Sequence, residues 1–497
     1  MPTSVSKMVD RCAFTVQSLP NEVLLYIFSF HRLLSGTKNR PPAVAWRWHT
    51  LAHVCQRWRH LILGSLRHLG ARLLIPRNSL KTSLDSWPAP LSIWCDSEDY
   101  MSYEQMADVV AAFKHSDRIR EISLSVTIDH PFWRQSHNDK SFLELEHLAL
   151  SGSRPYYFPI ALPHEFLGGS TGPRRLRNIV LNDVYLPDLP QLLLSNRDLV
   201  SLHLGYYSLT CVGLISPEVL ATSLSAATQL EYLYIGCLPL HSESLLEWTS
   251  GNSSPLAVLP ALTYFHFGDS VEYMENFVSR IHAPHLKKLD VYFANRNSLD
   301  IPQLSQFISR TERLSSLPSR TSISLDRGSF TIKHHFNFPP SPEVCHVYLK
   351  YSDTRGWRMS QVDYICKTLS PLVSRVKQLK LSAFQLPSIL KRKTDPAPWL
   401  QLLAPYNSVE EVKFCGKGAP CTGIAGALEQ STQERAYELL PALRVLRIRG
   451  FHPWSFRLIK SFVAARQLAG RPVITRRLTQ NEQDTDWETS EDDTHQA

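Results

Sequence analysis

LEYLYI at residues 230–235 decides the fold, because its spacing of apolar residues returns along most of the 497-residue chain. The spacing is apolar-x-x-apolar-x-apolar, and the alternation in its second half is typical of a short strand with one buried face. Ten further clear copies are IREISL (119–124), LEHLAL (145–150), LRNIVL (176–181), LVSLHL (199–204), LTYFHF (262–267), LKKLDV (286–291), VCHVYL (344–349), VKQLKL (376–381), VEEVKF (409–414) and LRVLRI (443–448). A degenerate copy, TSISL (321–325), fills the widest gap, and LSIWC (91–95) is an earlier candidate.

The distance between successive copies is also regular. It ranges from 23 to 34 residues, and helical candidates lie between copies at 104–115, 216–228, 271–282 and 359–370. A strand–helix unit of this size buries too little apolar surface alone, so the units are expected to stack into one continuous core. We therefore predict an α/β repeat over residues 91–475, a leucine-rich-repeat-like solenoid with a curved parallel sheet and outer helices.

Residues 18–34 and 51–62 predict a small helical module before the repeats. SLPNEVLLYIFSFHRLL (18–34) places Pro20 in the first helical turn and Glu22 near the positive end of the helix dipole. In LAHVCQRWRHLI (51–62), apolar residues recur at i, i+3, i+4, i+7, i+10 and i+11 from Leu51, which predicts one face of a single helix. Cys55 lies on that face, which favours a buried thiol over a nucleophile or a metal ligand.

These two stretches carry a family resemblance. Leu19-Pro20, Glu22, Leu24 and Ile27-Phe28, followed by Val54-Cys55, Trp58-Arg59 and Leu61, resemble the F-box motif, which begins LP-x-E-x-L-x-x-I-F and ends V-C-x-x-W-R. SLKTSLDSWPAPLSIW (79–94) resembles the segment that links F-box and repeats in many F-box proteins of mushroom-forming (agaricomycete) fungi. The whole chain thus resembles an F-box/leucine-rich-repeat protein, although its repeats lack the consistent Asn that normally follows LxL.

The resemblance implies a non-catalytic function. F-box/leucine-rich-repeat proteins are substrate-recognition subunits of SCF-type E3 ubiquitin ligases, in which the F-box docks a Skp-type adaptor and, through it, a cullin-RING ligase. The repeat domain captures a protein target for ubiquitination. The residues implied in adaptor binding or in the core of the module are Leu19, Pro20, Leu24, Ile27, Phe28, Val54, Cys55, Trp58 and Leu61.

A strip of alternating strand residues is the candidate target-binding surface. The apolar positions of each copy point into the core, so the residues between them are expected on the concave face. This strip is aromatic in the middle and mostly basic at its C-terminal end, which favours a protein target with an apolar centre and an acidic side. The alternative is a solvated sheet face with incidental aromatics. The candidate residues are His203, Tyr232, Tyr234, Tyr264, His266, Tyr348, Lys380, Lys413 and Arg447.

Composition narrows the class of protein. The net charge of +8 is not concentrated in any long Lys/Arg block, which does not indicate a nucleic-acid binder. The nine cysteines are scattered and no apolar stretch approaches the roughly 18 residues that span a bilayer, so a cytoplasmic or nuclear protein without a membrane segment is expected. His282 and His285 form an HxxH without a second ligand pair, and no catalytic motif is found, so neither a metal nor a cofactor is expected.

The predicted organisation has five parts. They are a disordered N-terminus (1–17), the F-box (18–66), a linker (67–90), the solenoid (91–475) and a disordered acidic tail (476–497). Besides the ligase subunit, a non-catalytic leucine-rich-repeat interaction scaffold, whose F-box does not deliver substrates, remains an alternative.

Overall fold

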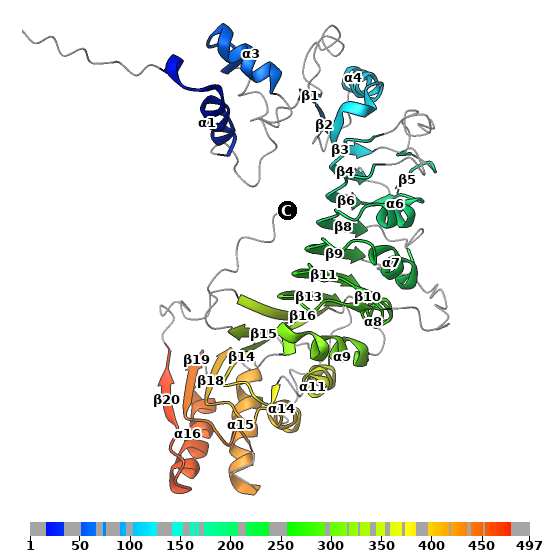
Figure 1. Ribbon diagram of the computed structural model, residues 1–497. Helices are drawn as coiled ribbons and strands as arrows, with labels where there is room; N and C mark the ends of the chain where they lie inside the picture. Colours follow the sequence, from blue (N-terminus) through cyan, green and yellow to red (C-terminus); the bar gives the residue numbers. More distant parts are fainter. Residues whose placement is uncertain are drawn as a thin grey trace, which may run out of the picture. The chain divides into compact units, whose positions relative to one another are not determined.

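A computed structural model describes much of the chain, in two compact units. The described residues are 16–33, 51–65, 73–75, 90–95, 103–126, 142–152, 160–164, 166–167, 173–206, 215–237, 256–293, 299–315, 318–326, 329–337, 344–352, 358–369, 373–383, 396–416, 419–434, 439–450 and 453–478. The first unit holds those up to Ser123, and the second holds those from Leu124 (Figure 1).

The first unit combines short helices with the start of a sheet. Strands β1 and β2 pair in parallel through Leu73 and Leu91, and α4 contacts both strands. The predicted linker at 67–90 therefore contains a strand. The elements are η1 (Val16–Ser18), α1 (Asn21–Leu33), α3 (Gln56–Gly64), β1 (Leu73–Ile75), β2 (Leu91–Cys95), α4 (Tyr103–Phe113), η3 (Ser116–Arg118) and β3 (Ile119–Val126), which reaches into the second unit.

The second unit is a large, mostly parallel sheet with helices along one side (Figure 1). Its strands are β4 (His147–Gly152), β6 (Asn178–Asn182), β8 (Ser201–Tyr206), β9 (Tyr232–Cys237), β11 (Tyr264–Asp269), β13 (Lys288–Phe293), β14 (Pro318–Leu325), β15 (Ser329–Asn337), β16 (Val344–Ser352), β17 (Gln378–Ala383), β18 (Glu411–Gly416), β19 (Val445–Arg449) and β20 (Ile474–Arg477). Two separate pairs are β5 (Ile160–Ala161) with β7 (Val184–Tyr185), and β10 (Ala257–Val258) with β12 (Ile281–His282).

The helices of this unit follow the strands in sequence. They are α6 (Leu189–Ser195), α7 (Pro217–Leu224), α8 (Val271–Val278), α9 (Pro302–Arg310), α10 (Glu312–Ser315), α11 (Met359–Thr368), α14 (Ala397–Leu403), α15 (Ala419–Glu434) and α16 (Pro453–Leu468). Helices α4, α7, α8 and α11 confirm the four helical candidates of the sequence. None of the described helices is long and apolar enough to cross a membrane.

The strand order departs from a simple succession of copies at one place. The order is β4-β6-β8-β9-β11-β13-β16-β15-β14-β17-β18-β19-β20, and all neighbours are parallel except β15, which is antiparallel to both β14 and β16. The degenerate copy TSISL thus lies beside β15 and β17 rather than beside β13. SFTIKHHFN (329–337), which has no copy of the repeat pattern, supplies the inserted strand β15.

One row of core residues runs across the sheet. In the clear copies of this unit, the second apolar position pairs in register with that of the neighbouring copy, which explains why they share one spacing. Strands β15 and β14 contribute His334 and Thr321 to the row instead. Each side chain in the row is at most 1 % exposed. The row reads Leu148, Ile179, Leu202, Leu233, Phe265, Leu289, Val347, His334, Thr321, Leu379, Val412 and Leu446.

The inserted strand places a polar pair in this apolar row. His334 Nδ1 lies 2.8 Å from the hydroxyl of Thr321, and both side chains are fully buried. Burial, and to a lesser extent the charge of His335, lowers the pKa of His334 to about 3. The ring is therefore neutral at physiological pH, which is what burial in an apolar core requires.

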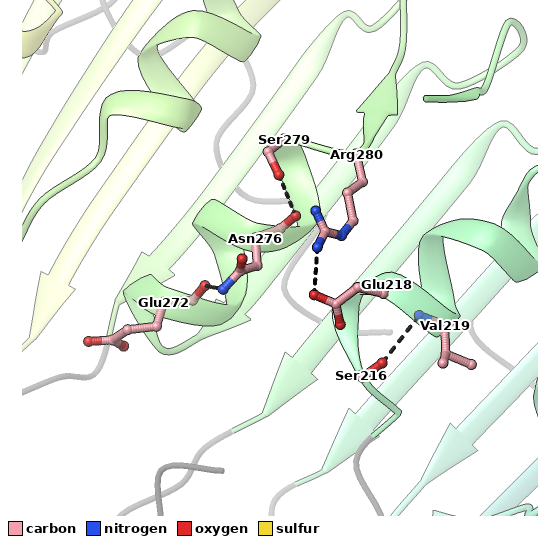
Figure 2. Close-up of polar contacts among 7 residues, drawn as sticks. All are labelled: Ser216, Glu218, Val219, Glu272, Asn276, Ser279 and Arg280. Atoms are coloured by element: carbon pink, nitrogen blue, oxygen red, sulfur yellow. Dashed lines mark hydrogen bonds and ion pairs between the residues drawn. The ribbon is translucent and has the colours of Figure 1, made fainter. Parts of the chain in front are cut away.

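Side-chain hydrogen bonds cap helix α7 and connect it to the C-terminal end of α8. Ser216 caps α7, its hydroxyl accepting from the Val219 N–H at 3.2 Å (Figure 2). Glu218, in the first turn of α7, accepts from Arg280 Nη2 at 2.8 Å, and Arg280 lies two residues after the end of α8. This half-buried ion pair links the helix that follows β8 to the helix that follows β11.

Candidate functional site

The face of the second unit's sheet opposite the core row carries a ladder of stacked rings. His203, Tyr234 and His266 occupy the same register position on β8, β9 and β11. Their rings are nearly parallel, with centroids 3.9 Å and 4.2 Å apart. The stack continues to Tyr292 at 4.9 Å and from there to Tyr348 at 5.3 Å. These five residues form the aromatic ladder.

The ladder changes register at β13 because Asp290 occupies the position that an aromatic residue holds elsewhere. The Tyr264 hydroxyl donates to Asp290 Oδ2 at 2.8 Å, and His346 Nε2 lies 2.9 Å from Oδ1. Burial alone would raise the pKa of Asp290, but the hydrogen bond and charge of His346, with the hydrogen bond from Tyr264, hold it below its usual value. Tyr264 also stacks on Tyr232 at 4.7 Å.

Three glycines lie in register beside the ladder, and one of them makes room for a ring. Gly205, Gly236 and Gly268 are neighbours on β8, β9 and β11, two residues beyond the stacked rings. A Cβ atom at Gly236 would lie 2.6 Å from Cε1 of Tyr234, so this ring lies directly over the glycine. Each of the three glycines directly follows one of three successive copies in the sequence. This recurrence is the sequence signal that marks the position beside the ladder.

The rings of the aromatic ladder contact one another. The rings of His203, Tyr234 and His266 stack face to face, whereas the Tyr292 ring is tilted by 32° to His266 and by 44° to Tyr348. The stacked part of the ladder therefore exposes ring edges rather than a flat platform. Burial lowers the pKa of His203 to about 4, so its ring is neutral at physiological pH. Among the described residues, no group of three His, Cys, Asp or Glu side chains is placed to hold a metal ion.

A basic row continues the same register toward the C-terminal end of the sheet. Lys380, Lys413, Arg447 and Arg476 pair in succession on β17, β18, β19 and β20. Arg447 Nε lies 2.5 Å from a carboxylate oxygen of Glu411. We refer to these four cations as the basic row.

Lys413 is less accessible to solvent than we expect for a residue of the candidate target-binding strip. Its side chain is only 5 % exposed, so it offers little surface to a target. Burial lowers the pKa of Lys413, and the neighbouring cations Lys380, Arg447 and Arg449 lower it further. The sequence alternation places Lys413 on this face but does not report how closely its neighbours crowd it.

The helical module in the first unit has its own small core. Leu24 and Phe28 on α1, with Ala52 and Ile62, are buried. The Phe28 ring meets Trp58 edge to face, with centroids 4.8 Å apart. Leu19, Trp58 and Leu61 are partly buried against this cluster. Five of the nine residues that the sequence assigned to adaptor binding or module core thus pack internally: Leu19, Leu24, Phe28, Trp58 and Leu61.

The prediction of one continuous helix over 51–62 is wrong. The chain makes a helical turn at 51–52 and a turn at 53–54, and α3 begins at Gln56. Cys55 is the N-cap, in extended conformation, and its sulfur accepts from the Trp58 N–H at 3.5 Å. A capping side chain of this kind satisfies an N–H that a continuous helix would have bonded to backbone.

Arg57 ties the two helices together, a role that the sequence did not reveal. Its guanidinium donates to Asn21 Oδ1 at 2.8 Å and 3.2 Å and to the Leu19 carbonyl at 2.6 Å. Arg59 donates to the Ala52 carbonyl at 3.1 Å. Both arginines are exposed, so they make these bonds from the surface of the module.

The module leaves apolar residues exposed on another face. Val23, Tyr26 and Ile27 lie at i, i+3 and i+4 on α1, and Val23 and Ile27 are 41 % and 45 % exposed. Val54, in the turn before α3, is 60 % exposed. Val23, Tyr26, Ile27 and Val54 are called the exposed apolar set. Pro20, at the start of α1, is also exposed.

Residues 16–68 match the F-box-like family. This chain carries an F-box-like domain. No curated protein matches the chain significantly. The match ends before the sheet, so the resemblance of the second unit to leucine-rich repeats, and of the whole chain to fungal F-box proteins, stays a prediction.

F-box domains generally bind Skp-type adaptors, which suggests an SCF-type adaptor role. In the F-box-like domain of this chain, the structure separates the predicted residues into two groups. Leu24, Phe28 and Trp58 pack in the core of the domain, whereas Ile27 and Val54 leave apolar surface exposed.

Proposed function

We propose that the chain is the non-catalytic substrate-recognition subunit of an SCF-type E3 ubiquitin ligase. Its F-box-like domain docks a Skp-type adaptor, which connects it to a cullin-RING ligase, and its repeat sheet captures a protein target in the cytoplasm or nucleus. The observation that carries this proposal is the exposed apolar set, which lies outside the cluster of described residues that packs in the core of the domain.

The exposed apolar set has the chemistry of a docking surface. Apolar side chains at i, i+3 and i+4 on one helix are the anchors of helix-in-groove recognition. Burying one Val or Ile fully contributes about 1.5–3 kcal/mol, so Ile27 and Val54 together contribute several kcal/mol to adaptor binding. Val23 and Tyr26 extend the same surface along α1.

The strand face of the second unit supplies the proposed target surface. The aromatic ladder offers ring edges and hydroxyl groups at its centre, and the basic row offers cations at one end. Tyr and Arg are enriched among interface anchors. We assign the exposed Arg476 and the half-buried Arg447 a larger part in target capture than the buried Lys413.

The test replaces exposed residues and leaves the core intact. Purified wild-type chain and an Ile27→Asp/Val54→Asp variant are each titrated with a Skp-type adaptor. The wild type is expected to bind and the variant to lose about 100-fold or more in affinity, because two anchors of about 2 kcal/mol each are removed and replaced by charge.

Val219→Asp is the matched control. Val219 is also 45 % exposed on a helix, but it lies on α7 in the second unit, where an acid near the helix N-terminus is favourable. Its adaptor affinity should equal that of the wild type. A wild-type chain that does not bind, or a double variant that binds equally well, would contradict the proposal.

A further inference from the structure

The basic row places four cations side by side with little acid among them. Neighbouring strands lie about 4.8 Å apart, and like charges directly opposite one another are destabilising. Glu411 is the one carboxylate in strands β17, β18, β19 and β20, and it lies beside Arg447. Arg449 and Arg477 add two further cations to the same strands. This end of the sheet therefore carries a strong excess of positive charge.

The chain continues from this charged end. The N–H of Leu478 donates to the Ile448 carbonyl at 2.9 Å, so the described chain stops beside β19, next to the basic row. Residues 479–497 lie outside the described residues. Their sequence holds seven carboxylates between 482 and 493 and no Lys or Arg: Glu482, Asp484, Asp486, Glu488, Glu491, Asp492 and Asp493. We call residues 482–493 the acidic segment.

The acidic segment is long enough to extend from Leu478 across the whole width of the row, in which Lys413 itself is buried. The row spans three strand spacings, about 14 Å from Arg476 to Lys380. Fifteen residues separate Leu478 from Asp493, and an extended chain of that length spans about 50 Å. A tether of this kind gives an effective concentration in the millimolar range.

We propose that the acidic segment binds the basic row of its own chain and competes there with acidic targets. The opposite charges of the two partners carry the interaction, and the tether makes it intramolecular. The competition rests on the proposed target-capturing function of the strand face, whereas the intramolecular binding does not depend on adaptor docking. An acidic target must then displace the segment, so only targets with greater acidic charge or additional contacts to the aromatic ladder are captured.

The test uses the full chain in two forms at low salt. In one form the seven carboxylates are replaced by their amides (E482Q, D484N, D486N, E488Q, E491Q, D492N and D493N). A fluorescent peptide with the sequence of residues 480–497 is titrated into each. The amide form is expected to bind the peptide at least about tenfold more tightly than the wild type, because its basic row is vacated.

Two further variants locate the binding surface. Lys380→Gln/Arg476→Gln, made in the amide form, removes both ends of the basic row and should weaken peptide binding by about tenfold. Arg174→Gln/Arg197→Gln removes two exposed cations elsewhere on the second unit and should leave peptide binding unchanged. Circular dichroism and the thermal midpoint verify that each variant is folded.

Three results would overturn the proposal. Equal peptide affinity for the wild type and the amide form would mean that the acidic segment does not occupy the row. A peptide affinity that is unchanged by Lys380→Gln/Arg476→Gln would mean that the peptide binds elsewhere on the chain. A wild-type chain that elutes as a dimer, and an amide form that elutes as a monomer, would show that a second copy supplies the segment. None of these results depends on the adaptor, so they leave the adaptor-docking test separate.

Discussion

The two halves of the strand face in the second unit differ in how their side chains are satisfied. In the aromatic ladder, each ring packs on the next, and Asp290 receives hydrogen bonds from Tyr264 and pairs with His346. In the basic row, neighbouring strands present like charges to one another. The same register thus carries a row of aromatic side chains in mutual contact and, a few strands further, a row of like charges.

This difference separates structural from functional residues better than exposure alone. The ladder residues are half-buried and satisfied by their neighbours, so their replacement should affect stability first. Arg476, the exposed cation of the basic row, should affect binding first, because surface charges contribute little to stability. The following predictions test that separation, beginning with the largest expected effect.

Acid should destabilise the ladder through His203. Its folded-state pKa of about 4 is below the unfolded value near 6.5, so the unfolded state takes up a proton first as the pH falls. Stability is therefore lost between pH 6.5 and about 4, by about 2 kcal/mol after allowance for solvent screening. Denaturant unfolding at pH 7 and pH 4 should show a smaller loss for His203→Phe, which keeps the stack and removes the proton. Equal losses in both proteins would refute this.

Sequence reasoning recovers the regular part of this architecture and misses its interruptions. The spacing of apolar residues predicts the strands and places their side chains on the correct faces, because both follow from period-two alternation. Strand β15 was missed because SFTIKHHFN lacks the repeat pattern and inserts by antiparallel pairing. The break at Cys55 was missed because apolar spacing alone does not detect a capping side chain.

The candidate sites show the same limit. Alternation identifies Lys413 as a strand-face residue, but its burial depends on neighbouring strands that are distant in sequence. In the F-box-like domain, the motif identifies Leu24, Ile27 and Phe28 together. Only the packing of α1 against α3 shows that Ile27 is exposed while the other two are core.

Gly236→Ala should cost about 1–2 kcal/mol of stability. The added Cβ atom must displace the Tyr234 ring, which opens the stack to His203 and His266. Gly268→Ala is the control, because the atoms nearest to its Cβ are 3.8 Å away. Its unfolding free energy should stay unchanged or rise slightly. Chemical denaturation of both variants measures the difference, and an equal cost at both glycines would disprove the close packing of Tyr234.

Arg476→Gln should have the smallest effect on stability. Made in the chain whose acidic segment is neutralised, it removes one like charge from the basic row and should raise the unfolding free energy by no more than about 0.5 kcal/mol. The gain should shrink between 50 and 500 mM NaCl, because salt screens exposed charges. A loss above about 1 kcal/mol would mean that the basic row, like the ladder, is stabilised from within.

The central claim is that the F-box-like domain joins this chain to a Skp-type adaptor. Calorimetric titration of the purified full chain with a purified Skp-type adaptor tests it most directly. We expect a one-to-one complex with a Kd at or below about 1 µM, or about −8 kcal/mol, and a negative heat-capacity change from burial of the exposed apolar set. Absence of binding heat at two temperatures, with separate elution of the two proteins at 100 times that concentration, about 100 µM, would contradict it.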